Sequence, residues 1–300
     1  MITQAQLDAL QPAFSALYQG GLAQVESQYT QFATVAPSSG ASNVYGWLGQ
    51  MPNLRKWGGP RELRQLQQHS YTIENEDFEE TVIVQRNHIK DDQLGMYNMM
   101  FTELGRAVAA HPDQMCASAL QSGWSEICYD GQNFFDTDHP VIGKDGEVST
   151  VSNTQTGTGP AWFLMDDTRA VKPIIYQERE PFNMQSMDSP NDQHVFMNKE
   201  FIYGVDGRNA VGYGFWQMII GSKQPLTPEN YKAARTALRG MTGDHVRPLG
   251  LKGTLLMVSG SLEDDALELL NTDRNASGAT NKYKGTAKLL VSDWLDAEAA

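Results

Sequence analysis

The chain has 300 residues, 40% of them hydrophobic and 9% aromatic, which is enough to bury a core and excludes a chain disordered throughout. Its 36 acidic residues outnumber the 23 basic ones and give a formal net charge of -13. This balance disfavours a protein whose main task is to coat nucleic acid, because Lys and Arg carry the affinity for phosphates. Two cysteines, Cys116 and Cys128, are too few for a disulfide scaffold, and we expect both to be reduced and buried.

Residues 3–19 predict an amphipathic helix, because apolar side chains recur there at helical spacing. They are Leu7, Leu10, Phe14 and Leu17. We expect the helix to end at Gly20-Gly21 and a polar, extended stretch to follow it. The first residues lack the basic and apolar segments of a signal peptide, and no later apolar run is long enough to span a bilayer. An N-terminal part of this kind has no core of its own and needs another surface to lie on.

Residues 41–90 combine aromatic and apolar side chains with basic ones in a segment rich in Gly and Pro. The apolar residues are Trp47, Leu48, Met51, Leu54 and Trp57, and the basic ones are Arg55, Lys56, Arg61 and Arg64. Two runs with strand character follow, 71–78 and 81–86, and they predict a long hairpin. A lone hairpin is marginal in water. Two interpretations therefore stay open: a two-stranded lobe of the core, or a projecting arm whose aromatic side chains bury against another subunit.

Residues 92–122 give the longest helical signal. Their apolar stripe consists of Tyr97, Phe101, Leu104 and Val108. Pro112 predicts a break or kink near His111, and Gly123 is expected to close the helix. Residues 129–160, rich in Gly, Ser, Thr and Asn, resemble an exposed flap.

The region 170–222 is rich in strand signals, with a polar loop expected from Pro181 to Asn191 and a hairpin turn expected at Asp206-Gly207. From residue 223 onward, helical and strand patterns alternate. The chain is therefore predicted to be α+β, with a small α/β-like layer at its C-terminal end.

No phosphate-binding or nucleophile-elbow motif occurs in the sequence. The cluster that most resembles a catalytic one consists of Asp136, Asp138 and His139, which could hold a divalent metal in a hydrolase. The alternative is a turn in which the two carboxylates accept hydrogen bonds from nearby backbone N–H groups. We prefer the turn, because neighbouring residues of one loop seldom converge on a metal without ligands from elsewhere in the chain.

Several segments, in order, resemble the major head subunit of Mu-like phages. They are NVYGWLGQMP at 43–52, DDQLGMY at 91–97, CYDGQNFFD at 128–136, KPIIYQER at 172–179 and GYGFWQM at 212–218. Together they span nearly the whole chain. The resemblance implies the Hong Kong 97-like capsid fold. Its parts would be an N-terminal arm (1–40), an extended loop (41–90), a mainly peripheral domain (91–222) and a mainly axial domain (223–300). Within the peripheral domain it implies a spine helix at 92–122, a flap at 129–160 and a sheet at 170–222.

The resemblance also implies a function without catalysis, cofactor or metal. Copies would join as hexamers and pentamers into an icosahedral head shell that encloses double-stranded DNA without sequence-specific binding. Expected partners are a scaffolding protein, a portal and a decoration protein of the same phage, with no membrane involved. The protein would be assembled in the host cytoplasm and reside in the virion.

Within this framework, we expect the extended loop to lie across a neighbouring subunit. Trp47, Leu54 and Trp57 would anchor it there, and the basic residues would meet an acidic surface. The basic residues are Arg55, Lys56, Arg61 and Arg64. Two alternatives remain: an encapsulin-like compartment shell of the same fold, and the metal-dependent hydrolase that uses Asp136, Asp138 and His139.

Overall fold

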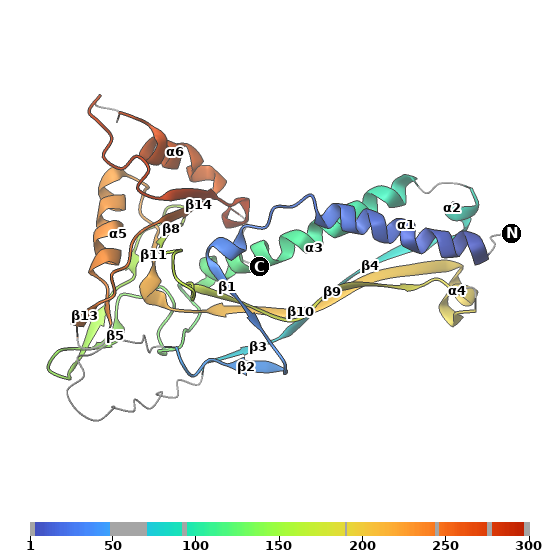
Figure 1. Ribbon diagram of the computed structural model, residues 1–300, viewed down its shortest axis with the longest axis horizontal. Helices are drawn as coiled ribbons and strands as arrows, with labels where there is room; N and C mark the ends of the chain where they lie inside the picture. The colour runs from blue at the N-terminus through green and yellow to red at the C-terminus, as the bar shows by residue number, and fades with distance from the viewer. Residues whose placement is uncertain are drawn as a thin grey trace.

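The computed structural model describes residues 4–48, 71–91, 95–189, 191–243, 246–274 and 278–296 and shows an elongated molecule built around two sheets (Figure 1). At one end, helices α1 (Gln4–Leu22) and α3 (Gly95–Ser122) lie along a long sheet. At the other end, α5 (Pro228–Gly240) and α6 (Glu263–Asn271) accompany a second sheet. This arrangement confirms the predicted α+β class.

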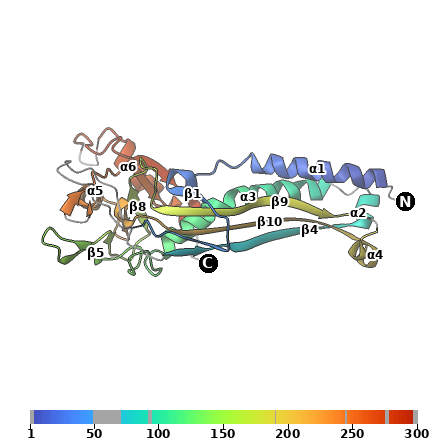
Figure 2. The same cartoon turned by 60° about the horizontal axis from the view of Figure 1, so that its bottom comes forward.

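The long sheet is organised around its central strand, β10. In spatial order its strands are β1 (Ala33–Pro37), β9 (Ile174–Met187), β10 (Glu200–Tyr213) and β4 (Glu76–Gln85). Strand β10 pairs antiparallel with both neighbours, and β1 is parallel to β9. Buried and less buried positions alternate along much of β10, because successive side chains of a strand point to opposite faces. Phe201, Tyr203 and Val205 thereby join the core under the helices (Figure 2).

The hairpin predicted for residues 71–86 is wrong. Strand β4 continues without a turn and pairs along its whole length with β10. The shorter β3 (Thr72–Glu74) pairs instead with β2 (Ser42–Val44). The residues between the two predicted strands, Glu79 and Glu80, are not turn formers, and β10 offers an unbroken ladder to extend along.

The turn predicted at Asp206-Gly207 is also wrong, since β10 continues through it. The loop predicted from Pro181 to Asn191 begins later than expected, because β9 continues to Met187. The ladder between the two strands shifts register at Asp206–Arg208. A Cβ atom at Gly207 would lie 2.8 Å from the ring of Phe182. This glycine therefore makes room for an aromatic ring. Pro181 lies opposite the same irregularity, where the missing N–H costs no regular ladder bond.

Two glycines set the approach of α1 to α3. A Cβ atom at Gly21 would lie 2.1 Å from the backbone oxygen of Thr102, and one at Gly105 would lie 2.1 Å from that of Tyr18. Only glycine allows the helix backbones to come this close. Helix α1 continues through the predicted stop to Leu22, so Gly21 serves packing and not termination. Helix α1 was expected to need another surface to lie on, and α3 of the same chain provides that surface.

Helix α3 contains Pro112 but runs unbroken to Ser122, so the break predicted near His111 does not occur. The expected stripe packs in the core: the rings of Phe101 and Phe14 stack with centroids 4.2 Å apart. Beyond the proline, Cys116 and Leu120 are completely buried. Packing on both sides outweighs the roughly 3 kcal/mol that an interior proline costs a helix.

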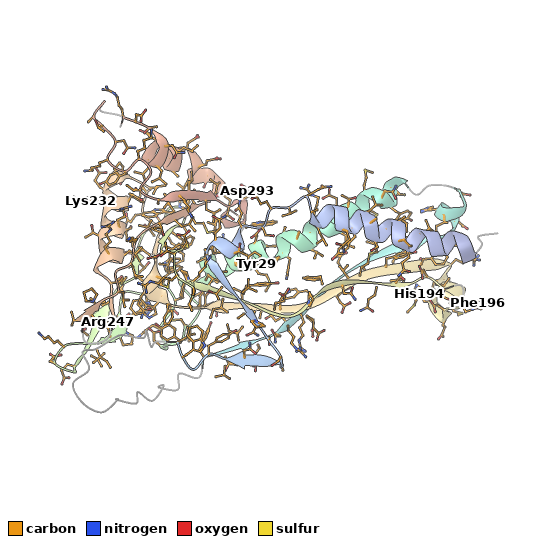
Figure 3. The ribbon with its side chains drawn as sticks, viewed as in Figure 1. Tyr29, His194, Phe196, Lys232, Arg247 and Asp293 are labelled. Atoms are coloured by element: carbon orange, nitrogen blue, oxygen red, sulfur yellow. The ribbon has the colours of Figure 1, made fainter. Side chains whose placement is uncertain are left out.

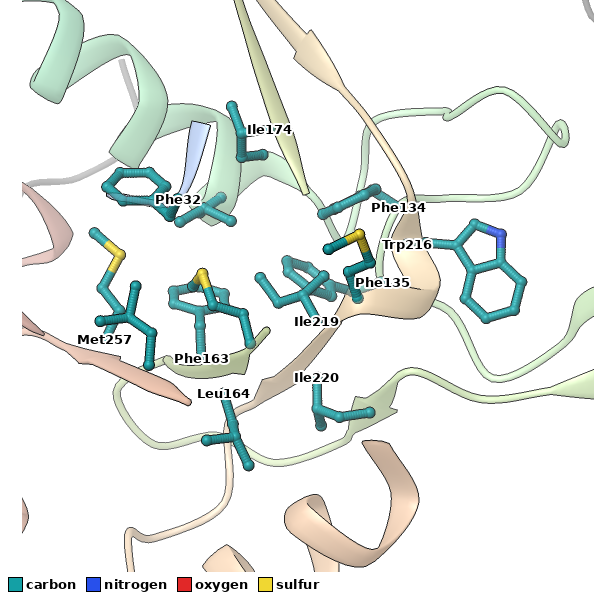
Figure 4. Close-up of a cluster of buried hydrophobic side chains, with 14 of the residues drawn as sticks. Phe32, Phe134, Phe135, Phe163, Leu164, Ile174, Trp216, Ile219, Ile220 and Met257 are labelled. Carbon is teal, nitrogen blue, oxygen red and sulfur yellow. The ribbon is translucent and has the colours of Figure 1, made fainter. Parts of the chain in front are cut away.

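The second sheet is the centre of the larger core. Its strands, in spatial order, are β15 (Lys288–Val291), β14 (Leu255–Val258), β8 (Trp162–Met165), β11 (Ile219–Ser222) and β7 (Thr154–Gln155). Every residue of β8, β11 and β14 is buried, and Figure 4 shows Phe163, Ile219 and Met257 packed together. Helix α5 begins after Thr227, whose side chain accepts a hydrogen bond from the Asn230 N–H.

The remaining elements are short. They are α2 (Arg86–Lys90), α4 (Gln193–Asn198), the hairpin of β5 (His139–Ile142) and β6 (Val148–Val151), and the pair β12 (Thr242–Gly243) and β13 (Arg247–Pro248). The region predicted as a flap therefore contains a hairpin and strand β7. None of the helices in the described ranges is long and apolar enough to cross a membrane.

Gly20 and Gly21 provide a matched test of the helix packing. Gly21→Ala should lower the free energy of unfolding by about 1–3 kcal/mol, because the new Cβ atom has no room. Gly20→Ala should leave stability unchanged or raise it by about 0.5–1 kcal/mol, because no atom lies within 4 Å of the position. Urea unfolding of the full chain measures both, and equal effects of the two substitutions would contradict the packing role.

Candidate intersubunit surface

The described residues on either side of 49–70 lie side by side. The Tyr45 N–H donates to the Tyr71 carbonyl over 2.8 Å, and strands β2 and β3 pair antiparallel just beyond. Whatever path residues 49–70 take, they start and finish at one point of the body. Six of the seven predicted contact residues fall in this segment and lie outside the described residues. They are Leu54, Arg55, Lys56, Trp57, Arg61 and Arg64.

The residues that flank this segment, 45–48 and 71–75, are called its root here. Trp47, the seventh predicted contact residue, lies in the root. Its ring contacts Phe215 edge-on at 5.8 Å and Tyr45 at 6.2 Å, while 37% of the residue remains exposed. The next residue, Leu48, is completely buried. One side of the Trp47 ring is thus held by the body and the other faces outward, an arrangement that suits a contact with another molecule.

A buried polar network fixes the root to strand β9. The Tyr45 hydroxyl donates to Gln177 Oε1 over 2.8 Å. Gln177 Nε2 donates to Asn75 Oδ1 over 2.7 Å, and Asn75 Nδ2 donates to Ser38 Oγ over 2.8 Å. Burial raises the pKa of Tyr45, which keeps its hydroxyl a donor. The network joins both sides of the root and the long sheet into one unit.

Close packing completes the root. Ile73 is buried against Gly212, where a Cβ atom would lie 2.3 Å from Ile73 Cδ1. The Tyr213 N–H donates to the Tyr71 hydroxyl over 2.9 Å. Sequence reasoning missed Gln177 and Asn75, because isolated amides in strands carry no pattern that separates buried from exposed ones. The aromatic residues around Gly212 were the one available signal.

An acidic surface lies on the edge of the long sheet. It consists of the exposed residues Glu74, Glu76, Asp77, Glu79 and Glu80. Strand β4 pairs with β10 on one side, and no described strand pairs with its other side. Within the described ranges, the one ion pair made by this group joins Asp77 to Arg208 Nε at 3.2 Å. Most of its negative charge is therefore available to a basic partner.

Exposed apolar residues gather at the far tip of the long sheet. Phe196 and Met197 on α4 are 77% and 69% exposed, and Figure 3 shows Phe196 at this tip. Their neighbour Val195 is buried in the core with Tyr97. Large apolar side chains this exposed are typical of surfaces that another protein covers.

The structure does not bring Asp136, Asp138 and His139 together as a metal site. His139 is completely buried and turns to Asp130, with Nδ1 2.8 Å from Oδ2. Asp136 accepts a hydrogen bond from the Thr137 N–H, as in the turn interpretation. Asp138 is exposed, and hydrogen bonding with Asp136 and the charge of that carboxylate raise its pKa.

Both cysteines are free and buried, as predicted. Burial raises the pKa of each thiol. Cys128 donates to Asp130 Oδ1 over 3.0 Å, so Cys128, Asp130 and His139 form one buried group. Burial alone would raise the pKa of Asp130, but hydrogen bonds from His139 and Cys128 outweigh it and lower that pKa.

Comparisons with known proteins point to one family. The family described as Mu-like prophage major head subunit gpT matches residues 7–295. The major capsid protein of Escherichia phage Mu is 41% identical over 304 residues, which cover 98% of this chain and 100% of the Mu protein.

Solved structures agree. A chain of the procapsid of bacteriophage JBD30 has 43% identity and a TM-score of 0.86, covering 98% of this chain and 100% of its own length. A chain of the JBD30 capsid decorated with minor capsid protein trimers has 34% identity and a TM-score of 0.77, covering 92% of this chain and 93% of its own.

Tyr45→Phe tests the network under the root. The substitution leaves the buried Gln177 Oε1 without its donor, and we expect a loss of about 1–3 kcal/mol in the free energy of unfolding. Tyr29→Phe is the matched control, because the Tyr29 ring contacts Tyr176 at 5.1 Å while no hydrogen bond of its hydroxyl is found within the described part of the chain. Thermal unfolding compares the two, and an equally small effect would contradict the network's importance.

Proposed function

Because the chain belongs to the family of Mu-like prophage major head subunits, we propose that its copies join into a closed shell through the segment that leaves the body after Leu48 and returns at Tyr71. The chain is a major capsid protein, a structural component of the virion and not an enzyme. A compartment shell for enzyme cargo and a metal-dependent hydrolase are therefore not favoured. The observation that carries the assembly route is the pairing of the segment's two ends.

The copies would gather as hexamers and pentamers that close into an icosahedral shell around double-stranded DNA. Each contact can be weak, because a subunit held by several neighbours at once dissociates only when all contacts open together. The net charge of -13 supports a lining with little affinity for phosphates. A genome could slide along such a lining during packaging and ejection.

Residues 49–70 would bind a neighbouring copy through an apolar anchor and the basic residues around it. Trp47, Leu54 and Trp57 supply the anchor. Four cations then lie within the same stretch of sequence, namely Arg55, Lys56, Arg61 and Arg64. The acidic edge of β4, with most of its carboxylates unpaired, has the complementary charge. This complementarity supports the contact and would favour one register of neighbouring copies.

Other proteins of the same phage would complete the particle. We propose a separate scaffolding protein, a portal and a decoration protein as partners. The JBD30 relative, whose capsid carries minor capsid protein trimers, supports the last of these. The exposed apolar residues at the tip of the long sheet give such partners, or further copies, a surface to cover.

Trp57→Ala tests the anchor. Burial of a large aromatic side chain is worth about 1.5–3 kcal/mol, and the loss repeats at every copy, so we expect few or no closed particles. Trp57→Phe retains an aromatic ring and should assemble better. Electron microscopy and sedimentation of particles measure assembly, and thermal unfolding of the unassembled subunit should be unchanged in both variants. Normal particles from Trp57→Ala would overturn the anchor.

A further inference from the structure

A buried charged network lies at the base of the β5–β6 hairpin. His139 is the first residue of β5 and is completely buried. Its ring stacks on Trp216 with centroids 4.0 Å apart and planes 9° from parallel. Strands β5 and β6 form a two-stranded sheet of their own. Since an isolated hairpin is marginally stable in water, its position depends on the residues at its base.

The orientation of the Asn153 amide shows that Nε2 of His139 carries a hydrogen. Asn153 Nδ2 faces two backbone carbonyls, those of Phe134 at 2.8 Å and Trp216 at 3.3 Å. Its Oδ1 accepts from the Asp136 N–H over 3.0 Å. The opposite amide orientation would set oxygen against both carbonyls, so Oδ1 is the atom that faces His139 Nε2 at 3.2 Å. An oxygen there requires that Nε2 carry a hydrogen.

The Asp130 carboxylate shows that Nδ1 of His139 also carries a hydrogen. Its Oδ2 lies 2.8 Å from His139 Nδ1, and its Oδ1 accepts from the Cys128 thiol at 3.0 Å and the Gln132 N–H at 3.1 Å. These donors, together with the lowered pKa of Asp130, indicate a carboxylate that only accepts. A second acceptor facing Nδ1 requires a hydrogen there as well.

We propose that His139 is a buried imidazolium, held between Asp130 and Asn153, and that this charge locks the β5–β6 hairpin to the body of the subunit. The charge is matched from several sides. Asp130 pairs with it directly, Asp136 and Asp138 add negative charge from the preceding turn, and the face of Trp216 favours a cation. Within the described ranges, no Lys or Arg forms an ion pair with these three carboxylates.

The same atoms could hold a metal ion, since ligand atoms of Cys128, Asp130 and His139 lie within 4.8 Å of one another. The hydrogen bonds favour the proton. Burial raises the pKa of the Cys128 thiol, which keeps it a donor to Asp130. Every polar atom of the group already has a partner of opposite kind. A metal bound by these three residues would have to replace the hydrogen bonds that Asp130 accepts from Cys128 and His139.

The lock should fail at low pH. Because the pKa of Asp130 is lowered in the folded protein, its contribution is present above the ordinary value of 3.8 and is lost as the pH falls through the lower folded value. The hairpin then opens more readily, while the long sheet is unaffected.

Hydrogen exchange of the full, unassembled chain measures this directly. After correction for the intrinsic exchange rate, we expect the β5–β6 amides to lose protection when the negative charge that faces His139 is removed. Amides of β9 and β10 serve as the internal control. Asp130→Asn should lower hairpin protection at neutral pH, and Glu147→Gln, at an exposed carboxylate in the turn between β5 and β6, should behave as the unaltered chain. Equal hairpin protection in Asp130→Asn and in the unaltered chain would overturn the lock.

A second measurement reports the protonation of His139 directly and does not depend on the stability of the hairpin. Nitrogen NMR of the chain labelled at its histidines should show two protonated ring nitrogens for His139 at pH 7, identified by their absence in His139→Gln. One protonated nitrogen would contradict the imidazolium. Elemental analysis of the purified protein completes the test, because one bound zinc ion per chain would put a metal where we place the proton.

Discussion

The hydrogen bond from the Tyr45 N–H to the Tyr71 carbonyl is the constraint from which the account of this subunit follows. It brings the two ends of residues 49–70 to a single point. That point is tied to strand β9 through Gln177 and packed against Gly212. A segment rooted in this way can project from the body without disturbing the fold beneath it. We therefore propose that the apolar and basic residues of this segment make contacts between copies.

The body that carries the root is stiff along its length. Strand β10 has a partner on each side, and α3 runs along the same sheet while its second half enters the larger core. One helix thus belongs to both ends of the molecule.

Periodic features were predictable from the sequence, and features set by distant contacts were not. The stripe of Tyr97, Phe101 and Leu104 identified α3, since it reflects one helix face. Gly21 and Gly207 were misread as punctuation, because the same residue also permits close approach, and only the structure supplies the neighbours Thr102 and Phe182. His139 was grouped with Asp136 and Asp138 by proximity in sequence. Its actual partner, Asp130, lies on the other side of a turn.

Electron cryomicroscopy of particles assembled from the unaltered chain is the most direct test of the central claim. The account predicts that density for residues 49–70 leaves the body at Trp47, crosses to a neighbouring copy and places Trp57 in a buried contact, with the basic residues near the β4 edge. Density that returns over its own copy, with Trp57 buried in the subunit from which it originates, would contradict the account.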